Sequence, residues 1–507
     1  MKTYHTIKTL ALGGIAMFSL ASCSLDYEPL SEPSEITQGG QTETSTAVLK
    51  DKAAADAQLK SLYELFRNRQ EHTHLDYLLI GDSHSDNAYA GTTGAEVVPY
   101  ETNSIDASNS VLSRDWNRYL EDIAKANVLI NGVEQLKENG QISETEYHSY
   151  KAQGEIFRAL MMFRMARLWG SFPVITTIAK TITSDNINEV YPTYYPPRKT
   201  PKECYEQIIA DLTDAEQYAP DNDNSDRTKM TKTVAQAMLA KVYAEKEVQD
   251  YDKVIAYADK VMNTTGVELE DSYETLWGYD ETAIDCMKRN TKEGILEVHW
   301  SGGGNWETWM YGRQLDNWDY YFTWAKWITP SRDIINDFDK EGDEVRKNQA
   351  IVYYACTWSN YYPASNYPFM YKLRSSYNNI YWVRLADIIL MKAEAEAYKG
   401  NLAESAKLVN QIRKRAKLKE LTSDKTGSKE SMIEAVLHER RLELAFEGER
   451  WFDLCRNNKV EKYLNGIDSR DSGRIRQVKQ FDSNSYLLPI PQTALDQNTN
   501  LEQNPGY

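Results

Sequence analysis

Apolar residues along most of the chain recur every three or four positions, which is the period of a helix with one buried face. The clearest run lies near the middle of the chain and comprises Ala152, Ile156, Ala159, Phe163 and Ala166. Further apolar residues fill its other faces, so we expect a deeply buried helix that ends at Gly170 and Pro173.

Similar periodicity predicts helices elsewhere. Their expected ranges are 50–68, 114–137, 201–218, 231–247, 251–263, 383–399, 403–416 and 430–446. Strand-like segments are few and short, and the pattern as a whole predicts an all-α protein.

Two pairs of these helices share a layout. Ala237 and Ala240 precede the turn of the first pair, and Ala393 and Ala397 precede the turn of the second. Small residues allow close antiparallel packing, as in stacked tetratricopeptide-like units. Two unrelated hairpins in an all-helical fold are the alternative, because the full repeat consensus is not met.

Helical periodicity weakens between residues 268 and 380, where aromatic residues and glycines dominate. We therefore divide the chain into a helical region over 47–267, a loop-rich insertion over 268–380 and a second helical region over 381–507. A chain of 507 residues is long enough for one elaborated domain or two packed ones, and we expect one compact unit.

The start of the chain has the features of a lipoprotein signal. Lys2 and Lys8 precede a short apolar run over 9–21, and Leu20-Ala21-Ser22-Cys23 forms a lipobox. We predict a signal peptide over 1–22, lipidation of Cys23 and a polar tether over 23–46. An ordinary secretory signal, with Cys23 incidental, is the alternative.

Charge narrows the choice of partners. The chain carries a formal net charge of −17 and no basic stripe, which excludes nucleic acid as a partner. The five cysteines show no CxxC spacing and indicate no zinc or redox motif. A neutral ligand such as a sugar meets no electrostatic repulsion.

Several ordered motifs in the mature chain resemble the SusD/RagB family. They are Phe157-Arg158-Ala159-Leu160, Arg167-Leu168-Trp169-Gly170, Arg384-Leu385-Ala386-Asp387-Ile388, Glu439-Arg440-Arg441, Glu443-Leu444-Ala445-Phe446-Glu447-Gly448, Arg450-Trp451-Phe452-Asp453-Leu454, Leu488-Pro489-Ile490-Pro491 and the closing Asn504-Pro505-Gly506-Tyr507. Slight departures are Glu449, where histidine is frequent, and Cys455, where arginine is common.

The resemblance implies one α-helical superhelix of tetratricopeptide-like pairs with a large insertion. It also implies a lipid-anchored protein on the cell surface, at the bacterial outer membrane, that passes glycans to a SusC-like TonB-dependent transporter. Family members bind their ligands without catalysis, so we expect no enzymatic activity and no cofactor.

The insertion holds the main candidates for glycan contact. Six of the chain's twelve tryptophans lie between residues 300 and 327. Ring faces complement the C–H faces of sugars. We predict glycan contacts at Trp300, Trp306, Trp309, Tyr320 and Tyr321. For each tryptophan, a buried wedge that fixes the insertion is the alternative.

A second candidate is the polar segment over 81–89, which follows an apolar, strand-like run over 75–80. It resembles a Ser-Asp-Asn-Ala segment of the family, so Asp82, Asn87 and Tyr89 are further predicted glycan contacts. A capped turn without ligand contact is the alternative.

Two other groups of polar residues invite a chemical interpretation. The charged motif over 439–453 has carboxylates and guanidiniums at helical spacing, which favours internal ion pairs over catalysis. His72, His74 and His84 lack a clear partner ligand, and Asp226 and Lys232 break a calcium-loop pattern, so we expect no metal site.

Two other functions stay open. Some relatives serve oligopeptide uptake, which would depend on a groove that reads peptide backbone. Glycoside hydrolysis would need two carboxylates about 5 to 9 Å apart. The carboxylates among the aromatic residues are Glu297, Glu307, Asp316 and Asp319.

Overall fold

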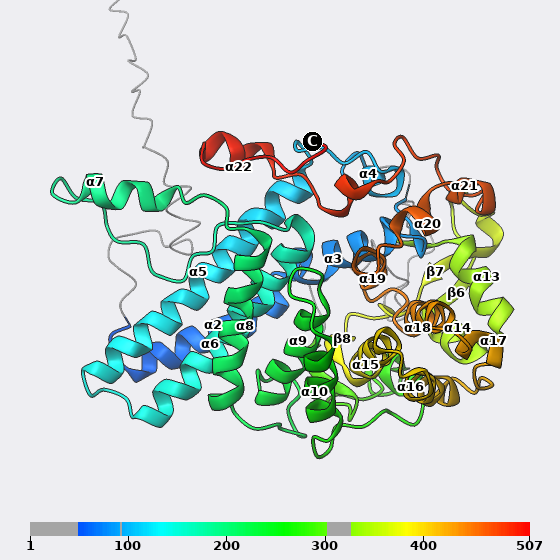
Figure 1. The fold of residues 1–507 in the computed structure, drawn as a ribbon, viewed down its shortest axis with the longest axis horizontal. Coiled ribbons are helices and arrows are strands. Elements are labelled where there is room, and N and C mark those ends of the chain that lie inside the picture. The colour runs from blue at the N-terminus through cyan, green and yellow to red at the C-terminus, as the bar shows by residue number, and fades with distance from the viewer. Residues whose placement is uncertain (1–48, 92–93, 302–325) are drawn as a thin grey trace, which may run out of the picture.

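The computed structural model describes residues 49–91, 94–301 and 326–507, and within them helices dominate (Figure 1). The long helices are α2 (Lys52–Asn68), α5 (Ser110–Glu138), α6 (Glu144–Trp169), α8 (Pro201–Tyr218), α9 (Lys232–Ala244), α10 (Tyr251–Met262), α13 (Arg332–Glu341), α15 (Leu385–Lys399), α16 (Leu402–Arg415) and α18 (Lys429–Glu443). The all-α prediction is confirmed. Helix α13 lies in the insertion and was not predicted.

Shorter helical segments connect the long ones. They are η1 (Glu71–Leu75), α3 (Asp76–Leu78), η2 (Leu79–Ser83), α4 (Val98–Thr102), α7 (Ile187–Val190), η3 (Tyr191–Tyr194), α11 (Glu274–Trp277), α14 (Glu344–Ala350), η4 (Ala364–Asn366), α17 (Ser423–Thr426), α19 (Arg450–Arg456), α20 (Val460–Leu464), α21 (Ile467–Arg470), η5 (Ser483–Tyr486) and α22 (Gln492–Gln497).

Helix α6 is buried over most of its length, as its apolar residues predicted. It begins eight residues before the predicted start because Ser143 and Glu146 form a capping box: each side chain accepts a hydrogen bond from the other's backbone N–H, at 3.2 and 2.8 Å. It ends at Gly170, whose φ of 73° suits glycine.

The helices stack in chain order. Each of α5, α6, α8, α9 and α10 packs on the next, and α10 then packs on α15, which also contacts α16 and α18. The two predicted hairpins, α9–α10 and α15–α16, are therefore neighbours that meet through α10 and α15. This arrangement is a tetratricopeptide-like superhelix and not two unrelated hairpins.

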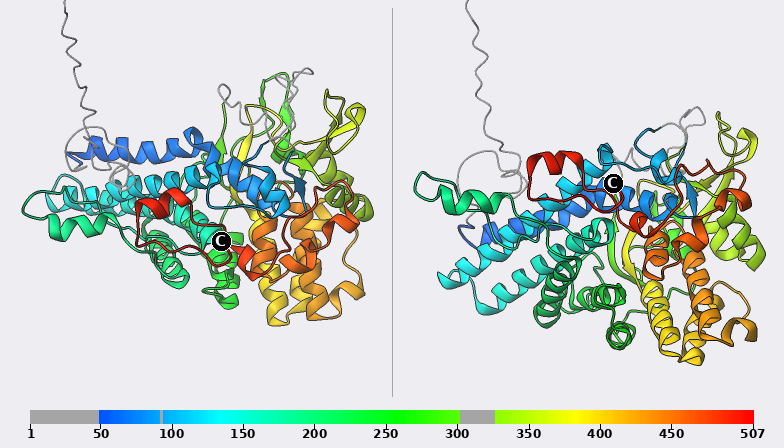
Figure 2. Two further views of the ribbon diagram at one scale, coloured as in Figure 1. Left: turned by 90° about the horizontal axis from the view of Figure 1, so that it is seen from above. Right: turned by 45° about the horizontal axis from the view of Figure 1, so that its top comes forward.

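The insertion contributes strands to four short antiparallel pairs of the described chain, one of them with β1 of the N-terminal region. They are β1 (Ala88–Tyr89) with β5 (Thr329–Pro330), β2 (Tyr279–Asp280) with β3 (Asp285–Cys286), β4 (Gly294–His299) with β8 (Asn379–Arg384), and β6 (Ile351–Tyr354) with β7 (Tyr367–Met370). Figure 2 shows, in its left view, the strands of the insertion on the opposite side of the molecule from the yellow helices α15 and α16.

One prediction about secondary structure was wrong. The apolar run over 75–80, expected as a strand, is part of the helical stretch η1–α3–η2. Leu75, Leu79 and Ile80 are all buried there. A short apolar run fits a buried helix as well as a buried strand, and only its surroundings select between them.

The main hydrophobic core of the described residues extends from Leu49 to Ala494 and includes Trp300 and Phe338 of the insertion. Two small clusters, one around Tyr273 and one around Tyr367, lie beside it. In the described parts of the chain, no helix is both long enough and apolar enough to cross a bilayer. The predicted signal peptide and tether over 1–46, with Cys23, lie outside the described residues.

Candidate functional site

The segment over 81–89 is part of the protein interior. Asp82 is fully buried and accepts hydrogen bonds from Asn87 Nδ2 at 2.8 Å, from the backbone N–H of Phe446 at 3.1 Å and from that of Gly448 at 2.9 Å. Burial raises the pKa of Asp82 to about 7, although these donors oppose the shift. Its carboxyl group is fully used in joining η2 to the loop after α18.

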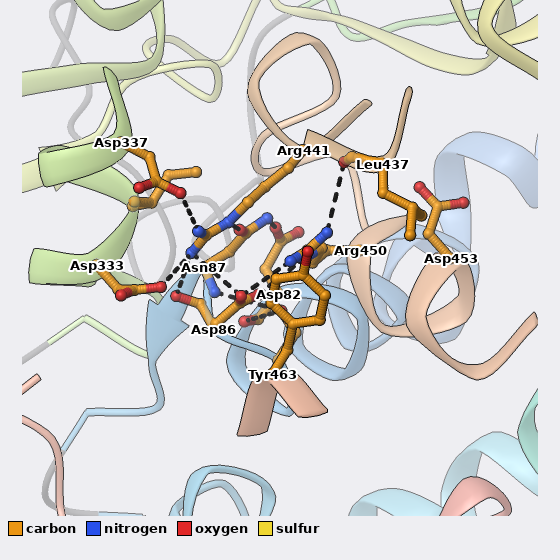
Figure 3. A network of polar contacts seen from close by, with 12 residues as sticks. Asp82, Asp86, Asn87, Asp333, Asp337, Leu437, Arg441, Arg450, Asp453 and Tyr463 are labelled. Carbon is orange, nitrogen blue, oxygen red and sulfur yellow. Dashed lines mark hydrogen bonds and ion pairs between the residues drawn. The ribbon is translucent and has the colours of Figure 1, made fainter. Parts of the chain in front are cut away.

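The next residues continue this interior network (Figure 3). Arg450 donates to both carboxylate oxygens of Asp86, at 2.8 and 2.9 Å. Arg441 donates to Asn87 Oδ1 at 2.9 Å and to Asp333 at 2.9 Å. Burial would raise the pKa of Asp86, but the charges of Arg441 and Arg450 outweigh burial and hold it well below its usual range.

Tyr89 is also buried. Its hydroxyl donates to Asp471 at 2.5 Å, and its ring stacks on Tyr361 with centroids 4.3 Å apart. Asp82, Asn87 and Tyr89 therefore have no side-chain surface for a ligand in this structure. We correct the prediction of glycan contact at these three residues, because in this structure they hold the scaffold together.

Trp300 is only 2% exposed and lies in the core, near His74. It is a buried wedge and not a stacking platform, which corrects the prediction for this residue. Trp306, Trp309, Tyr320 and Tyr321 lie outside the described residues, so their predicted roles stay predictions.

The charged motif over 439–453 forms internal ion pairs, as predicted. Glu443 is fully buried and accepts from Arg384 at 2.6 Å and from Arg346 at 3.2 Å. Glu449, which departs from the family pattern, accepts from Arg167 and Lys241, each at 3.0 Å. These pairs join α18 and its following loop to the remaining helices.

Glu297, a candidate acid for hydrolysis, is almost fully buried. It accepts from the backbone N–H of Asn290 at 3.0 Å and of Thr291 at 2.8 Å, and from His299 Nε2 at 2.7 Å. Its carboxylate is committed to a turn before β4. Glu307, Asp316 and Asp319 lie outside the described residues.

The three clustered histidines make separate internal contacts. His72 Nε2 lies 2.8 Å from Asp122, His74 Nε2 lies 3.0 Å from the carbonyl of Phe66, and His84 Nδ1 lies 2.6 Å from the carbonyl of Tyr100. Within the described ranges, no three metal-binding side chains gather into a group that could hold an ion.

A surface that sequence reasoning did not single out is the aromatic hairpin, which we define as residues 351–370. In β6, Tyr353 is 38% exposed and Tyr354 is 37% exposed. Neighbouring residues of a strand point to opposite faces, so each face of the hairpin carries one of these rings.

The face that carries Tyr354 is the richer in rings. Tyr354 pairs across the hairpin with Tyr367, and half-buried Trp358 packs on Tyr367 with centroids 5.7 Å apart. Asn360 and Asn366, in the loop between the strands, are exposed. Aromatic rings beside amide groups can stack on a sugar and hydrogen-bond its hydroxyls. We call Tyr354 and Trp358, together with the fully buried Tyr367 that supports them, the aromatic platform.

The loop of the aromatic hairpin is fixed to the scaffold. The hydroxyl oxygen of Tyr361, whose ring stacks on Tyr89, lies 2.5 Å from the carbonyl oxygen of Gly91 and 2.7 Å from Glu101, and its one proton is donated to one of these two acceptors. Tyr362 donates to the carbonyl of Pro330 at 2.8 Å. The predicted residue Tyr89 thus supports the loop from below.

A sequence signal for this surface existed. Within 351–371 there are eight aromatic residues, namely Tyr353, Tyr354, Trp358, Tyr361, Tyr362, Tyr367, Phe369 and Tyr371. The prediction favoured residues 300–327 instead, because tryptophan is denser there.

Two family models together match most of the chain. The model described as "SusD family" matches residues 292–507, and the one described as "Starch-binding associating with outer membrane" matches residues 41–244. The chain belongs to the SusD/RagB family.

Several related proteins align with this SusD-family protein over most of their length. SusD-like protein P2 of Formosa agariphila is 27% identical over 441 residues, which are 79% of this chain and 81% of the relative. The solved structure titled "Laminarin binding SusD-like protein" has a TM-score of 0.70 at 22% identity, with 90% of this chain and all of that chain covered. Surface glycan-binding protein A from Bacteroides fluxus has a TM-score of 0.72 at 21% identity, with coverages of 90% and 99%. The fold is therefore that of the SusD superfamily, and the family associates with the outer membrane.

Proposed function

We propose that this SusD-family protein is a cell-surface lipoprotein that binds oligosaccharides or polysaccharides and delivers them to a SusC-like TonB-dependent transporter. Acylation of Cys23 would anchor it in the outer membrane. In this proposal it captures the glycan without cleaving it.

The aromatic platform is the observation that carries the proposal. Tyr354 is partly exposed and Trp358 is half-buried, and both neighbour the buried Tyr367, the first by strand pairing and the second by ring contact. Because Tyr361 and Tyr362 bond to the scaffold, the rings are held in place before a ligand arrives. Preorganised rings lose little conformational entropy on binding.

The expected affinity is modest. If each stacked ring contributes about 0.5 to 1.5 kcal/mol, as aromatic pairs do, a few rings and hydrogen bonds give micromolar to millimolar dissociation constants. Such binding suits a protein that must release its ligand to a transporter. The glycan-binding relatives support the same ligand class. Trp306, Trp309, Tyr320 and Tyr321 remain proposed contributors.

A glycan array followed by calorimetry tests the ligand class, and Tyr354→Ala tests the site. We expect Tyr354→Ala to lower the affinity for the best glycan about threefold to tenfold, which corresponds to the loss of one stacked ring. Tyr353→Ala is the matched control, because that ring is at least as exposed but lies on the other face. Equal losses from both substitutions would refute the aromatic platform.

The same samples separate the other functions. Binding to oligopeptides with no response to any glycan would refute glycan capture and favour peptide uptake. Release of reducing ends from a bound polysaccharide would instead indicate hydrolysis.

Anchoring and delivery need their own test. We expect labelled palmitate to be incorporated into the full chain but not into Cys23→Ser, and we expect the native protein to co-purify with a TonB-dependent transporter. A chain that is secreted without lipid and purifies alone would contradict this part of the proposal.

A further inference from the structure

A cavity that shares no lining residue with the aromatic platform lies between α13, α18 and the loop that follows α16. Its volume is about 890 Å³, whereas the cavity beside Trp116 measures about 50 Å³. Ligand sites usually measure roughly 300 to 1,000 Å³, so this cavity, which we call the lysine cleft, is large enough for several sugar units. Figure 1 shows its elements together at the right of the molecule.

Three of the five carboxylates that line the lysine cleft form ion pairs with arginine or lysine side chains. Asp337 accepts from Arg441 at 2.5 Å, and Glu341 accepts from Arg413 at 3.0 Å. Glu434 lies within 2.8 Å of Lys459 and 2.6 Å of Lys462. These three acids therefore repel an incoming anion only weakly.

The lysines of the cleft have fewer ion-pair partners than these carboxylates. Lys340 lies 3.8 Å from Asp337, and among the described residues no carboxylate forms an ion pair with Lys417, Lys419 or Lys425. The remaining acids of the lining, Glu420 and Asp424, are the sequence neighbours of Lys419 and Lys425. His438 also lines the cleft and can carry a positive charge when protonated; its Nε2 lies 3.2 Å from Glu341 Oε1.

The loop that carries these lysines is well fixed. Arg413 donates to the carbonyl of Lys419 at 2.7 Å, and the backbone N–H of Leu421 donates to Asn410 at 2.9 Å. Lys417 has a φ of 59°, in the left-handed region where glycine is usual after a helix. Lys417, which lines the cleft, therefore has a backbone conformation that is unfavourable for residues other than glycine.

Hydrogen-bonding groups complete the lining. Thr422, Ser431 and Tyr463 also line the cleft; their hydroxyls donate to Asp424, the carbonyl of Ser428 and Glu434, which leaves their oxygens as acceptors. Glu420 and Asp424 present further acceptors for sugar hydroxyls. In a chain with a net charge of −17, a site for an anionic ligand needs a local excess of cations, because the remaining surface repels it.

We propose that the lysine cleft is a second saccharide site that binds sugars carrying carboxylate or sulfate groups, with Lys417, Lys419 and Lys425 contacting the anionic groups. This inference rests on the proposed glycan-binding function, but it concerns a different surface of the protein.

The test measures binding of three probes to the full mature protein: a galacturonate hexamer, a sulfated galactose hexamer and the neutral galactose hexamer. We expect one or both anionic hexamers to bind more tightly than the neutral one, and to lose affinity as salt is raised. Preference for the carboxylated or the sulfated probe identifies the source of the charge.

The variant Lys417→Gln/Lys419→Gln/Lys425→Gln should weaken binding of the anionic hexamer about fivefold or more. The matched control is Lys60→Gln/Lys202→Gln/Lys407→Gln, which removes the same charge from lysines that are 73% to 77% exposed on other helices. Both variants change only exposed side chains, so both should fold.

Equal loss of affinity in the two variants, or no preference for either anionic hexamer, would overturn the inference. Tyr354→Ala separates it from the proposed function: it should leave binding of the anionic hexamer unchanged. If neutral glycans fail to bind while the lysine variant weakens the anionic probe, the aromatic platform is wrong and the lysine cleft stands.

Discussion

Arg450 and Asp86 are 364 positions apart in the chain, yet they form a buried, two-bonded ion pair. The pair joins the segment after η2 to α19, so residues near the start of the described chain are fixed to residues near its end. The charged C-terminal motif therefore stabilises the region beneath the aromatic hairpin.

Arg450→Ala should destabilise the protein by about 3 to 5 kcal/mol, because it leaves the Asp86 carboxylate buried without its main partner. Urea unfolding measures the effect. Lys52→Ala is the control, since it removes a surface pair with Glu146 and should scarcely move the urea midpoint. A similar small shift in both variants would contradict the prediction.

Asp82 should make stability depend on pH. Its pKa is about 7 in the folded protein, above the value of an exposed aspartate, so its stabilising contribution is complete below about pH 4 and is lost as the pH rises through 7. Asp82→Asn should remove this part of the pH dependence. The effect is at most a few kcal/mol, since each pKa unit corresponds to about 1.4 kcal/mol.

The measurement for Asp82 is the free energy of unfolding of both proteins between pH 4 and 8. The wild-type protein should lose stability relative to Asp82→Asn over this range. Parallel curves would show that Asp82 does not titrate there.

Gly81→Ala should be strongly destabilising. A Cβ at Gly81 would lie 2.2 Å from the carbonyl oxygen of Gly448, and backbone cannot yield as a flexible side chain does. We expect a loss of at least about 2 to 3 kcal/mol in thermal or urea unfolding. Gly140→Ala, with open space but a φ of 68°, should cost only about 1 kcal/mol. Equal costs would show that η2 and the loop at Gly448 can separate freely.

Tyr361→Phe should loosen the aromatic hairpin. The substitution keeps the stack on Tyr89 but removes the hydroxyl that lies within hydrogen-bond distance of Glu101 and of the carbonyl of Gly91, at a cost of about 1 to 3 kcal/mol. Hydrogen exchange should rise over 356–366, and glycan affinity should fall. Tyr362→Phe, which loses a single bond to the carbonyl of Pro330, should have the smaller effect. Unchanged exchange in Tyr361→Phe would refute the anchoring role.

Local patterns in the sequence were sufficient for much of the fold. Apolar spacing located the long helices outside the insertion, and the C-terminal charged motif was correctly interpreted as structural. These features depend on neighbours within one or two helical turns, which the sequence displays directly. The capping box at Ser143 was also visible in the sequence, and with it the start of α6 could have been predicted more closely.

The sequence by itself determined the helical architecture and the family. Only the tertiary structure decided which polar and aromatic residues are buried. Trp300 and Asp82 looked like ligand contacts but are covered by the core and by the loop at Gly448, while Tyr354 remains partly exposed. Exposure depends on segments hundreds of residues away that pack over a side chain, and no local pattern records that packing.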